Sequence, residues 1–200
     1  MGRGDPRLAE DELAAALRRG ERSALRRFYD EQRDAALRTA LRILGQRADA
    51  EDAVHDAFVA LQAGIAGFRG RGTLAAWFFR ILTRRCLELR RRRARERADT
   101  AGRLSELPGP PAPAGAALGE LARALDAALG ELPLRQRLVF GLTEIEGFRS
   151  VEVARILGLD AGTVRFHLFR ARRALQQRLA AHRPPVDVVP LALSGEGAES

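Results

Sequence analysis

A cluster of helix-breaking residues near the middle of the chain limits what this sequence can fold into. Residues 108–115 read PGPPAPAG, and four prolines within eight positions can neither continue an α-helix nor pair in the middle of a sheet. We expect an extended linker there. The predicted organisation is therefore a first domain over residues 1–97, a linker over 98–117, a second domain over 118–183 and a disordered tail over 184–200.

Both domains read as helical. Apolar residues recur at steps of three and four, as in the series Val54, Ala57, Phe58, Leu61 and Ile65, and stretches of period-two alternation are lacking. The pattern predicts helices over residues 10–19, 22–44, 49–65, 73–97, 118–130, 134–147, 150–157 and 161–181. The 200 residues are 46% hydrophobic, which suffices for a small core in each domain. The expected fold class is all-α, with two small bundles joined by a flexible proline-rich linker.

Several classes of protein are disfavoured by what the sequence lacks. A single cysteine, Cys86, excludes a disulfide framework, and three scattered histidines do not form a metal-ligand cluster. No apolar run reaches the roughly 18 residues of a membrane span, so we expect no membrane insertion and a cytoplasmic location. No catalytic constellation has a usable spacing, and we expect no enzyme activity, metal or cofactor. Cys86 is interpreted as a packed thiol rather than a redox sensor, although neighbouring arginines would lower its pKa.

The charge is concentrated in two segments. The net charge is +8, but residues 69–97 hold 11 arginines and 2 acidic residues, and residues 163–183 hold 6 arginines and no acidic residue. The remaining segments are acidic or nearly neutral. Two local basic surfaces indicate a polyanionic partner, most simply a nucleic acid.

The second basic segment belongs to a predicted helix-turn-helix over residues 150–178. Gly158 stands where the first helix must end, and Asp160 is a good N-cap for the next. When that helix is projected at about 100° per residue, its core stripe comprises Val164, Leu168, Ala171, Leu175 and Leu179. The opposite side comprises Phe166, Phe169, Arg170, Arg173 and Gln177. Such a division suits a recognition helix in a major groove, with Arg165, Arg172 and Arg178 as phosphate contacts; a solvated basic helix is the less favoured alternative.

In the first domain, an acidic helix precedes an arginine-rich one. The acidic helix, with Asp49 as its N-cap, exposes Glu51, Asp52, His55, Asp56 and, further on, Gln62. From the residues alone, a capped surface helix is favoured over a docking face for a basic partner. A glycine-rich loop over 67–73 and the helix after it combine arginines with aromatic rings, which suits single-stranded nucleic acid. Phe68 and Phe79 are expected to be freer than Trp77, which lies on the core stripe; the run Arg90 to Arg93 could instead be a nonspecific patch.

Motifs in both domains resemble the sigma-70 family in its extracytoplasmic-function branch. They are AEDAVHDAF at residues 50–58, Trp77 with the following FFRI, Leu132-Pro133, EIEG at 144–147, Thr163-Val164 and RARRAL at 170–175. The resemblance covers about residues 22–97 and 118–180, in family order. It implies a non-catalytic subunit that binds core RNA polymerase and directs it to promoters.

The resemblance also implies roles for particular residues. The acidic helix would dock on the β′ clamp of core polymerase, the loop and arginine-rich helix would capture and melt the −10 element, and the recognition helix would read the −35 element. The β flap is a further expected contact, and an anti-sigma factor a possible regulator. The core-binding set is Asp49, Glu51, Asp52, His55, Asp56 and Gln62. The −10 set is Phe68, Arg69, Arg71, Phe79, Arg80, Arg84 and Arg91. The −35 set is Thr163, Arg165, Phe166, His167, Phe169, Arg170, Arg173 and Gln177. His55, Arg84, Phe166 and His167 depart from the residues common in the family.

Two other functions remain open at this point. A helix-turn-helix repressor or activator that binds duplex DNA as a dimer would explain residues 118–183, but not the loop and arginine-rich helix of the first domain. An RNA-binding adaptor would use both basic segments. Co-purification with core polymerase, unaided binding to a palindromic duplex, and preference for RNA would distinguish the three.

Overall fold

The computed structural model describes residues 6–100 and 120–180, whose regular elements are all helices, with no strand within those ranges. The all-α prediction is confirmed. Most of the predicted linker, and the tail from residue 184, lie outside the described residues.

The first domain comprises α1 (Pro6–Arg18), α2 (Arg22–Leu44), α3 (Arg47–Gly64), the 3-10 turn η1 (Ile65–Gly67) and α4 (Leu74–Thr100). Helices α2, α3 and α4 pack around three phenylalanines, one from each helix: the ring of Phe78 lies 5.6 Å from that of Phe28 and 4.4 Å from that of Phe58. Helix α3 begins at Arg47, with Gln46 before it, so Asp49 lies in the first turn. The prediction that Asp49 is the N-cap was wrong by three residues.

The second domain comprises α5 (Glu120–Gly130), α6 (Leu134–Phe140), a π-helical turn η2 (Gly141–Ile145), α7 (Ser150–Leu157) and α8 (Ala161–Leu179). The predicted α7 and the start of α8 are confirmed: Gly158 has a left-handed φ of 65°, and its N–H bonds to the carbonyl of Ala154. One continuous helix over 134–147 was expected, but α6 widens into η2, where the N–H of Glu146 bonds to the carbonyl of Gly141 at 2.9 Å.

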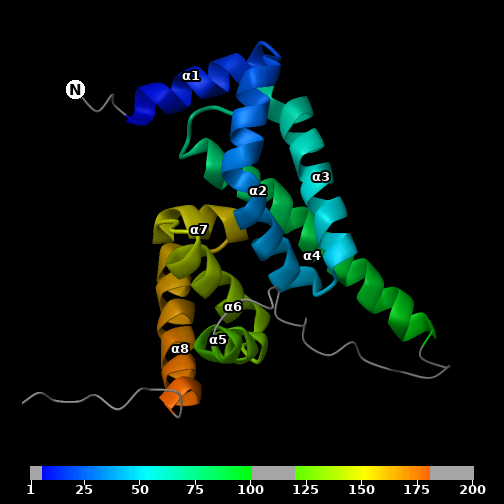
Figure 1. The fold of residues 1–200 in the computed structure, drawn as a ribbon, viewed down its shortest axis with the longest axis vertical. Coiled ribbons are helices and arrows are strands. Elements are labelled where there is room, and N and C mark those ends of the chain that lie inside the picture. The colour runs from blue at the N-terminus through cyan, green and yellow to red at the C-terminus, as the bar shows by residue number, and fades with distance from the viewer. Residues whose placement is uncertain (1–5, 101–119, 181–200) are drawn as a thin grey trace, which may run out of the picture.

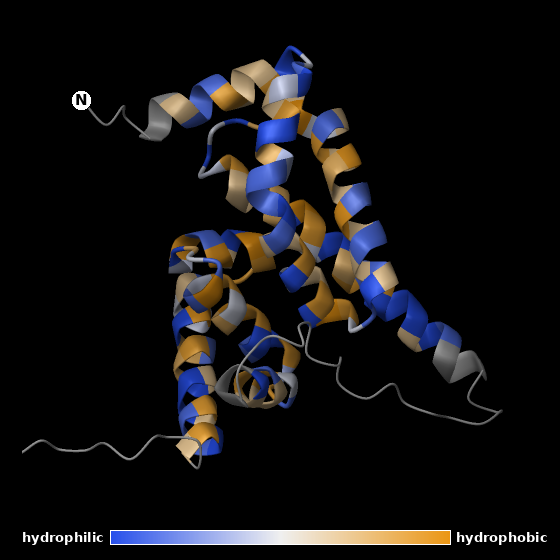
Figure 2. Cartoon of the chain, in the orientation of Figure 1, coloured by the Kyte–Doolittle hydropathy of each residue, from blue (hydrophilic) through white to orange (hydrophobic). Residues whose placement is uncertain are grey.

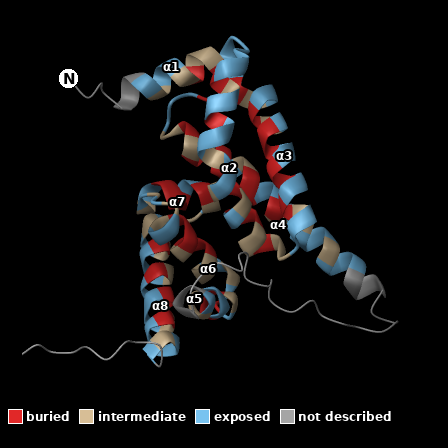
Figure 3. Ribbon diagram, viewed as in Figure 1, coloured by how far each residue is buried: buried red, intermediate tan, exposed pale blue. Residues whose placement is uncertain are grey.

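The two domains share one hydrophobic core, which the sequence did not predict. Helix α7 lies against α4, between the first domain and α8 (Figure 1). Buried Val153 and Ile156 of α7 belong to the same cluster as Phe79 and Leu82 of α4, and the buried residues run continuously across the junction (Figure 3). A smaller cluster, which includes Leu129 and Leu175, joins α5 to α8. We call this packed arrangement of the two domains the closed arrangement.

The two arginine-rich segments lie on different helices. Hydrophilic residues alternate with hydrophobic ones along α8, and they are dense on the C-terminal part of α4, which extends beyond its neighbours (Figure 2). These are the two basic segments of the sequence, now placed on separate surfaces of the same molecule.

Candidate nucleic-acid and polymerase interfaces

Helix α8 has the two faces that the sequence predicted. Val164, Leu168, Ala171 and Leu175 are buried, whereas Phe166, Phe169, Arg170, Arg173 and Gln177 are exposed. The helix is capped by Asp160, whose carboxylate accepts a hydrogen bond from the backbone N–H of Thr163 at 2.8 Å. Hydrogen bonds from the Thr163 side chain and backbone hold the pKa of Asp160 below its ordinary value. The carboxylate therefore stays ionised at the positive end of the helix dipole.

The arginines of α8 fall into two groups. Arg172 bonds to Glu144 and Arg178 bonds to Glu131, both at 2.7 Å. Across the described ranges, no ion pair engages Arg165, Arg170 or Arg173. These pairs attach α8 to η2 and to the turn after α5, and a phosphate contact of Arg172 and Arg178 stays a prediction. The unpaired arginines mark the outer face as the one available to an anion.

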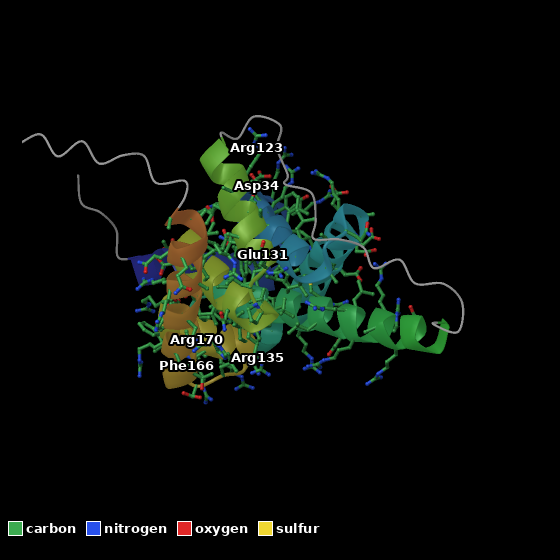
Figure 4. All side chains as sticks on the ribbon, turned by 90° about the horizontal axis from the view of Figure 1, so that it is seen from below. Asp34, Arg123, Glu131, Arg135, Phe166 and Arg170 are labelled. Atoms are coloured by element: carbon green, nitrogen blue, oxygen red, sulfur yellow. The ribbon has the colours of Figure 1, made fainter. Side chains whose placement is uncertain are left out.

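The remaining predicted −35 residues lie near the start of α8. The Thr163 side chain bonds to the cap Asp160 and is half-buried. His167 is also half-buried, and its Nδ1 is buried without a hydrogen-bond partner. Phe166 projects outward on the same side as Arg170, one helical turn away (Figure 4).

The two phenylalanines predicted to be free for base stacking are buried. Phe68 is 5% exposed and packs on Trp77, with ring centroids 5.6 Å apart. Phe79 is fully buried, and its ring lies 4.9 Å from that of Phe148 in the second domain. The expectation that both are freer than Trp77, which is itself half-buried, was wrong for this arrangement. Phe79 occupies a second apolar side of α4, which packs on the other domain.

Helix α1 supports the loop over residues 68–73. Arg18 donates a hydrogen bond from Nη2 to the carbonyl of Phe68 at 2.6 Å, and Glu10 accepts one from the backbone N–H of Leu74. These two residues hold both ends of the loop, but they are more than 45 positions away from it in sequence. Only the tertiary structure shows that Arg18 and Glu10 contact the loop.

The second domain also contacts the C-terminal end of the loop. Thr73 donates a hydrogen bond to Oε1 of buried Glu152 at 2.9 Å. Gly72 has a φ of +100°, a conformation that favours glycine, and the Arg155 side chain reaches it, since an added Cβ would lie 2.6 Å from Nη1. The predicted −10 loop is therefore partly covered by α7 in the closed arrangement.

Glu152 is a buried carboxylate at this contact. Although burial alone would raise its pKa, hydrogen bonds from the Arg149 backbone and from Thr73 and Arg149 side chains hold that pKa below its ordinary value. Arg149 lies in the second domain and Thr73 in the first, so the contact between the domains supplies one of the hydrogen bonds that stabilise the ionised form.

The predicted −10 arginines, Arg69, Arg71, Arg80, Arg84 and Arg91, are all exposed. Arg84 pairs with Glu88 at 2.9 Å on the same helix. For the other four, the described part of the chain provides no ion pair. They form an unneutralised basic surface along the loop and one side of α4.

More carboxylates of the acidic helix α3 form ion pairs within the chain than the sequence suggested. Asp49 pairs with Arg93 of α4, Glu51 with Arg47 at 2.8 Å, and Asp56 with Arg85 at 3.4 Å. Asp52, His55 and Gln62 are exposed, and no ion pair of theirs occurs within the described ranges. Asp52 is thus the predicted docking carboxylate with the least competition from within the chain.

An ion cluster joins the two domains at the end of α2. Glu146, whose side chain is 2% exposed, accepts hydrogen bonds from Arg38 at 2.7 and 3.2 Å and from Arg42 at 2.8 Å. Its hydrogen bonds raise the pKa of Arg38. The missing side chain of Gly141 lets Arg42 approach, because a Cβ there would lie 3.0 Å from its guanidinium. We call Arg38, Arg42 and Glu146 the interdomain ion cluster; sequence reasoning missed it.

Cys86 is a packed thiol, as predicted, but its pKa is not lowered. The side chain is fully buried in the shared core, and burial raises its pKa to about 12. The arginines nearby in sequence do not offset this effect. No helix in the described part of the chain is long and apolar enough to cross a membrane.

Comparison with known proteins identifies the family. Residues 28–96 match the family Sigma-70 region 2, and residues 122–175 match Sigma-70, region 4. Over 171 residues the chain is 31% identical to the ECF RNA polymerase sigma factor SigM of Mycobacterium tuberculosis strain H37Rv, a match covering 86% of this chain and 85% of SigM. The chain belongs to the sigma-70 family, in its extracytoplasmic-function branch. Like other members, this sigma factor binds core RNA polymerase and promoter DNA and directs promoter-specific transcription initiation.

Other relatives have the same architecture. This sigma factor is 33% identical over 189 residues to the RNA polymerase sigma factor CnrH of Cupriavidus metallidurans, covering 88% of this chain and 97% of CnrH. The structure of CnrH in complex with the cytosolic domain of CnrY superposes with a TM-score of 0.64 at 27% identity, over 88% of this chain and 99% of that one. The sigma factor RpoE in complex with the anti-sigma factor NepR, from Bartonella quintana, also gives 0.64, at 28% identity over 78% and 98% of the two chains.

Proposed function

We propose that the three surfaces divide the work of promoter recognition. The outer face of α8 reads the −35 element, the loop over residues 68–73 with the exposed arginines of α4 captures the −10 element, and the exposed side of α3 docks on the β′ clamp. The observation that carries this proposal is the unpaired arginine face of α8, because Arg165, Arg170 and Arg173 have no competing acid within the described chain.

The domain assignment is part of the same proposal. Residues 1–97 act as the region 2 domain and residues 118–183 as the region 4 domain, with the linker leading toward the RNA exit path and the β flap. We further propose a non-catalytic role in the cytoplasm. Two similar solved proteins were captured with NepR and with the cytosolic domain of CnrY, which supports an anti-sigma partner for this chain too.

We infer that the closed arrangement does not engage both promoter elements at once. Elements centred near −10 and −35 are about 25 base pairs apart, or about 85 Å at ~3.4 Å per base pair. Here, α7 and α4 pack in a shared core, and Thr73 of the −10 loop bonds to Glu152 beside the recognition helix. We infer that the domains separate when the holoenzyme forms on a promoter.

In vitro transcription with core polymerase on a genomic promoter library tests the proposal. We expect initiation from a defined promoter set, and for Arg170→Ala a selective loss at promoters with a consensus −35 element. Arg178→Ala, which removes an arginine paired with Glu131, is the matched control and should leave promoter choice unchanged. Palindrome binding without polymerase would favour the repressor alternative, and preference for RNA would favour the adaptor.

A further inference from the structure

Phe166 and Phe169 are the most exposed large hydrophobic side chains of the described residues, at 58% and 61%. The rings of Phe28, Phe58 and Phe78 are buried in the first-domain core. A phenyl ring left in water contributes little to folding, since its stabilising effect comes from area removed from water. Both exposed rings lie on α8, which suits a ligand that offers apolar groups beside an anionic backbone.

Phe166 lies on the same side of α8 as the unpaired arginine Arg170. It lies two positions from core residue Val164, and Arg170 follows one turn later on the same side (Figure 4). The ring of His167 meets that of Phe166 edge-on, with centroids 5.8 Å apart, which limits the orientations open to Phe166. The ring is thus presented in a restricted direction within a positive field.

Duplex DNA offers this combination in the major groove. Thymine carries a 5-methyl group there, and phenylalanine is among the side chains that make apolar contact with it. The N-terminal turns of a recognition helix are the part that reaches base edges, and Phe166 is the sixth residue of α8. We propose that Phe166 reads the 5-methyl group of one pyrimidine, a thymine in unmodified DNA, within the −35 element. This inference rests on the proposed function of α8.

The helix geometry also places that thymine relative to the base that Arg170 contacts. Residues four apart are separated by about 6 Å along a helix axis, at about 1.5 Å per residue. Because base pairs rise by ~3.4 Å, the methyl-bearing base lies within about two base pairs of the position read by Arg170. Phe169, a similarly exposed ring three residues along, would contact a different position or none.

The test uses the complete holoenzyme and promoters selected by it. Each thymine of the −35 element is replaced singly by deoxyuracil, which removes only the methyl group, and holoenzyme binding is measured for the wild type, Phe166→Ala and Phe169→Ala. At one position we expect about a fourfold loss for the wild type, the factor expected for one buried methyl-sized group. Phe166→Ala should bind thymine and uracil equally there, whereas Phe169→Ala should keep the difference.

A second arm separates the methyl group from the rest of the base. At the same position, 5-methylcytosine should bind better than cytosine by a similar factor in the wild type, and by none in Phe166→Ala. Both variants should have unchanged thermal stability, because the rings are exposed.

Three results would overturn the inference while leaving the proposed function intact. They are indifference to uracil at every −35 thymine, a uracil effect that persists in Phe166→Ala, and a Phe166→Ala loss of binding to core polymerase in the absence of DNA. The last would assign the ring to a protein contact. Failure of the proposed function itself looks different, since no promoter would then be selected by the holoenzyme.

Discussion

The interdomain ion cluster allows the closed arrangement to be weakened by a single nearly isosteric change. The Glu146 carboxylate accepts three hydrogen bonds from Arg38 and Arg42. Glu146→Gln keeps the shape of the side chain but removes the negative charge that these two guanidinium groups face. Arg38 is half-exposed and can return to water, but Arg42 is only 14% exposed and would keep a buried charge without its partner. We expect the closed arrangement to be destabilised by about 2 kcal/mol, which is the contribution of one hydrogen bond to a charged group. Removing a partner from a fully buried pair, which costs about 3–5 kcal/mol, sets the upper bound.

That loss corresponds to about a 30-fold shift toward the open state. Spin labels on Ser23→Cys and Gln176→Cys, one in each domain, would report the distance between domains by pulsed electron resonance. Native Cys86 is buried, and burial raises its pKa to about 12, so the introduced cysteines should be labelled selectively. The variant should show a longer, broader distance distribution than the wild type.

Glu144→Gln is the matched control. Its partner Arg172 lies within the same domain, and the two groups are 2.7 Å apart, so this variant loses an ion pair without touching the junction. Identical distance distributions for the wild type, Glu146→Gln and Glu144→Gln would refute the reasoning. So would equal opening in both variants, because the effect would then not belong to the interdomain ion cluster.

Three further predictions concern the outer face of α8, the exposed side of α3 and the contact between the domains. Arg173→Ala should weaken −35 discrimination by about 1–3 kcal/mol in holoenzyme binding assays if its contact is bidentate to a base, whereas an equal loss on all DNA would assign it to phosphate. Asp52→Arg should reduce binding to core polymerase in a pull-down without changing the circular dichroism spectrum, and Asp30→Arg, on α2, should not. Glu152, whose pKa is lowered in the folded chain, should contribute stability above its ordinary pKa and lose it as pH falls through the folded value. Melting temperatures of Glu152→Gln should accordingly vary less with pH across the acid range.

Local signals explain which parts of the fold were predictable. Helices α2 and α7 were predicted with the boundaries observed, because Gly45 and Gly158 end them in the left-handed conformation that glycine adopts easily. The two faces of α8 followed from periodicity alone. In these cases, the information lies within a few residues of the feature itself.

Features that depend on distant partners were not predictable in the same way. The π-helical turn η2 contains Gly141, against which Arg42 packs from almost a hundred positions earlier. The sequence places Trp77 on a core stripe of α4, but it does not reveal that α7 covers a second side of this helix. Charges such as Glu146 look like ordinary surface residues until a tertiary contact buries them.

The buried state of Phe79 gives the closed arrangement a functional meaning. Its ring is fully buried against Phe148, so it cannot stack on a base until the domains part. If Phe79 then contacts the −10 element, the same ring stabilises both the closed state and the promoter complex, and the two uses exclude each other. Two variants distinguish the two roles. Phe148→Ala removes only the contact that Phe79 makes in the closed state, whereas Phe79→Ala removes both that contact and the contact with the −10 element. We therefore expect Phe148→Ala to open the domains and retain promoter melting, and Phe79→Ala to open them and lose it.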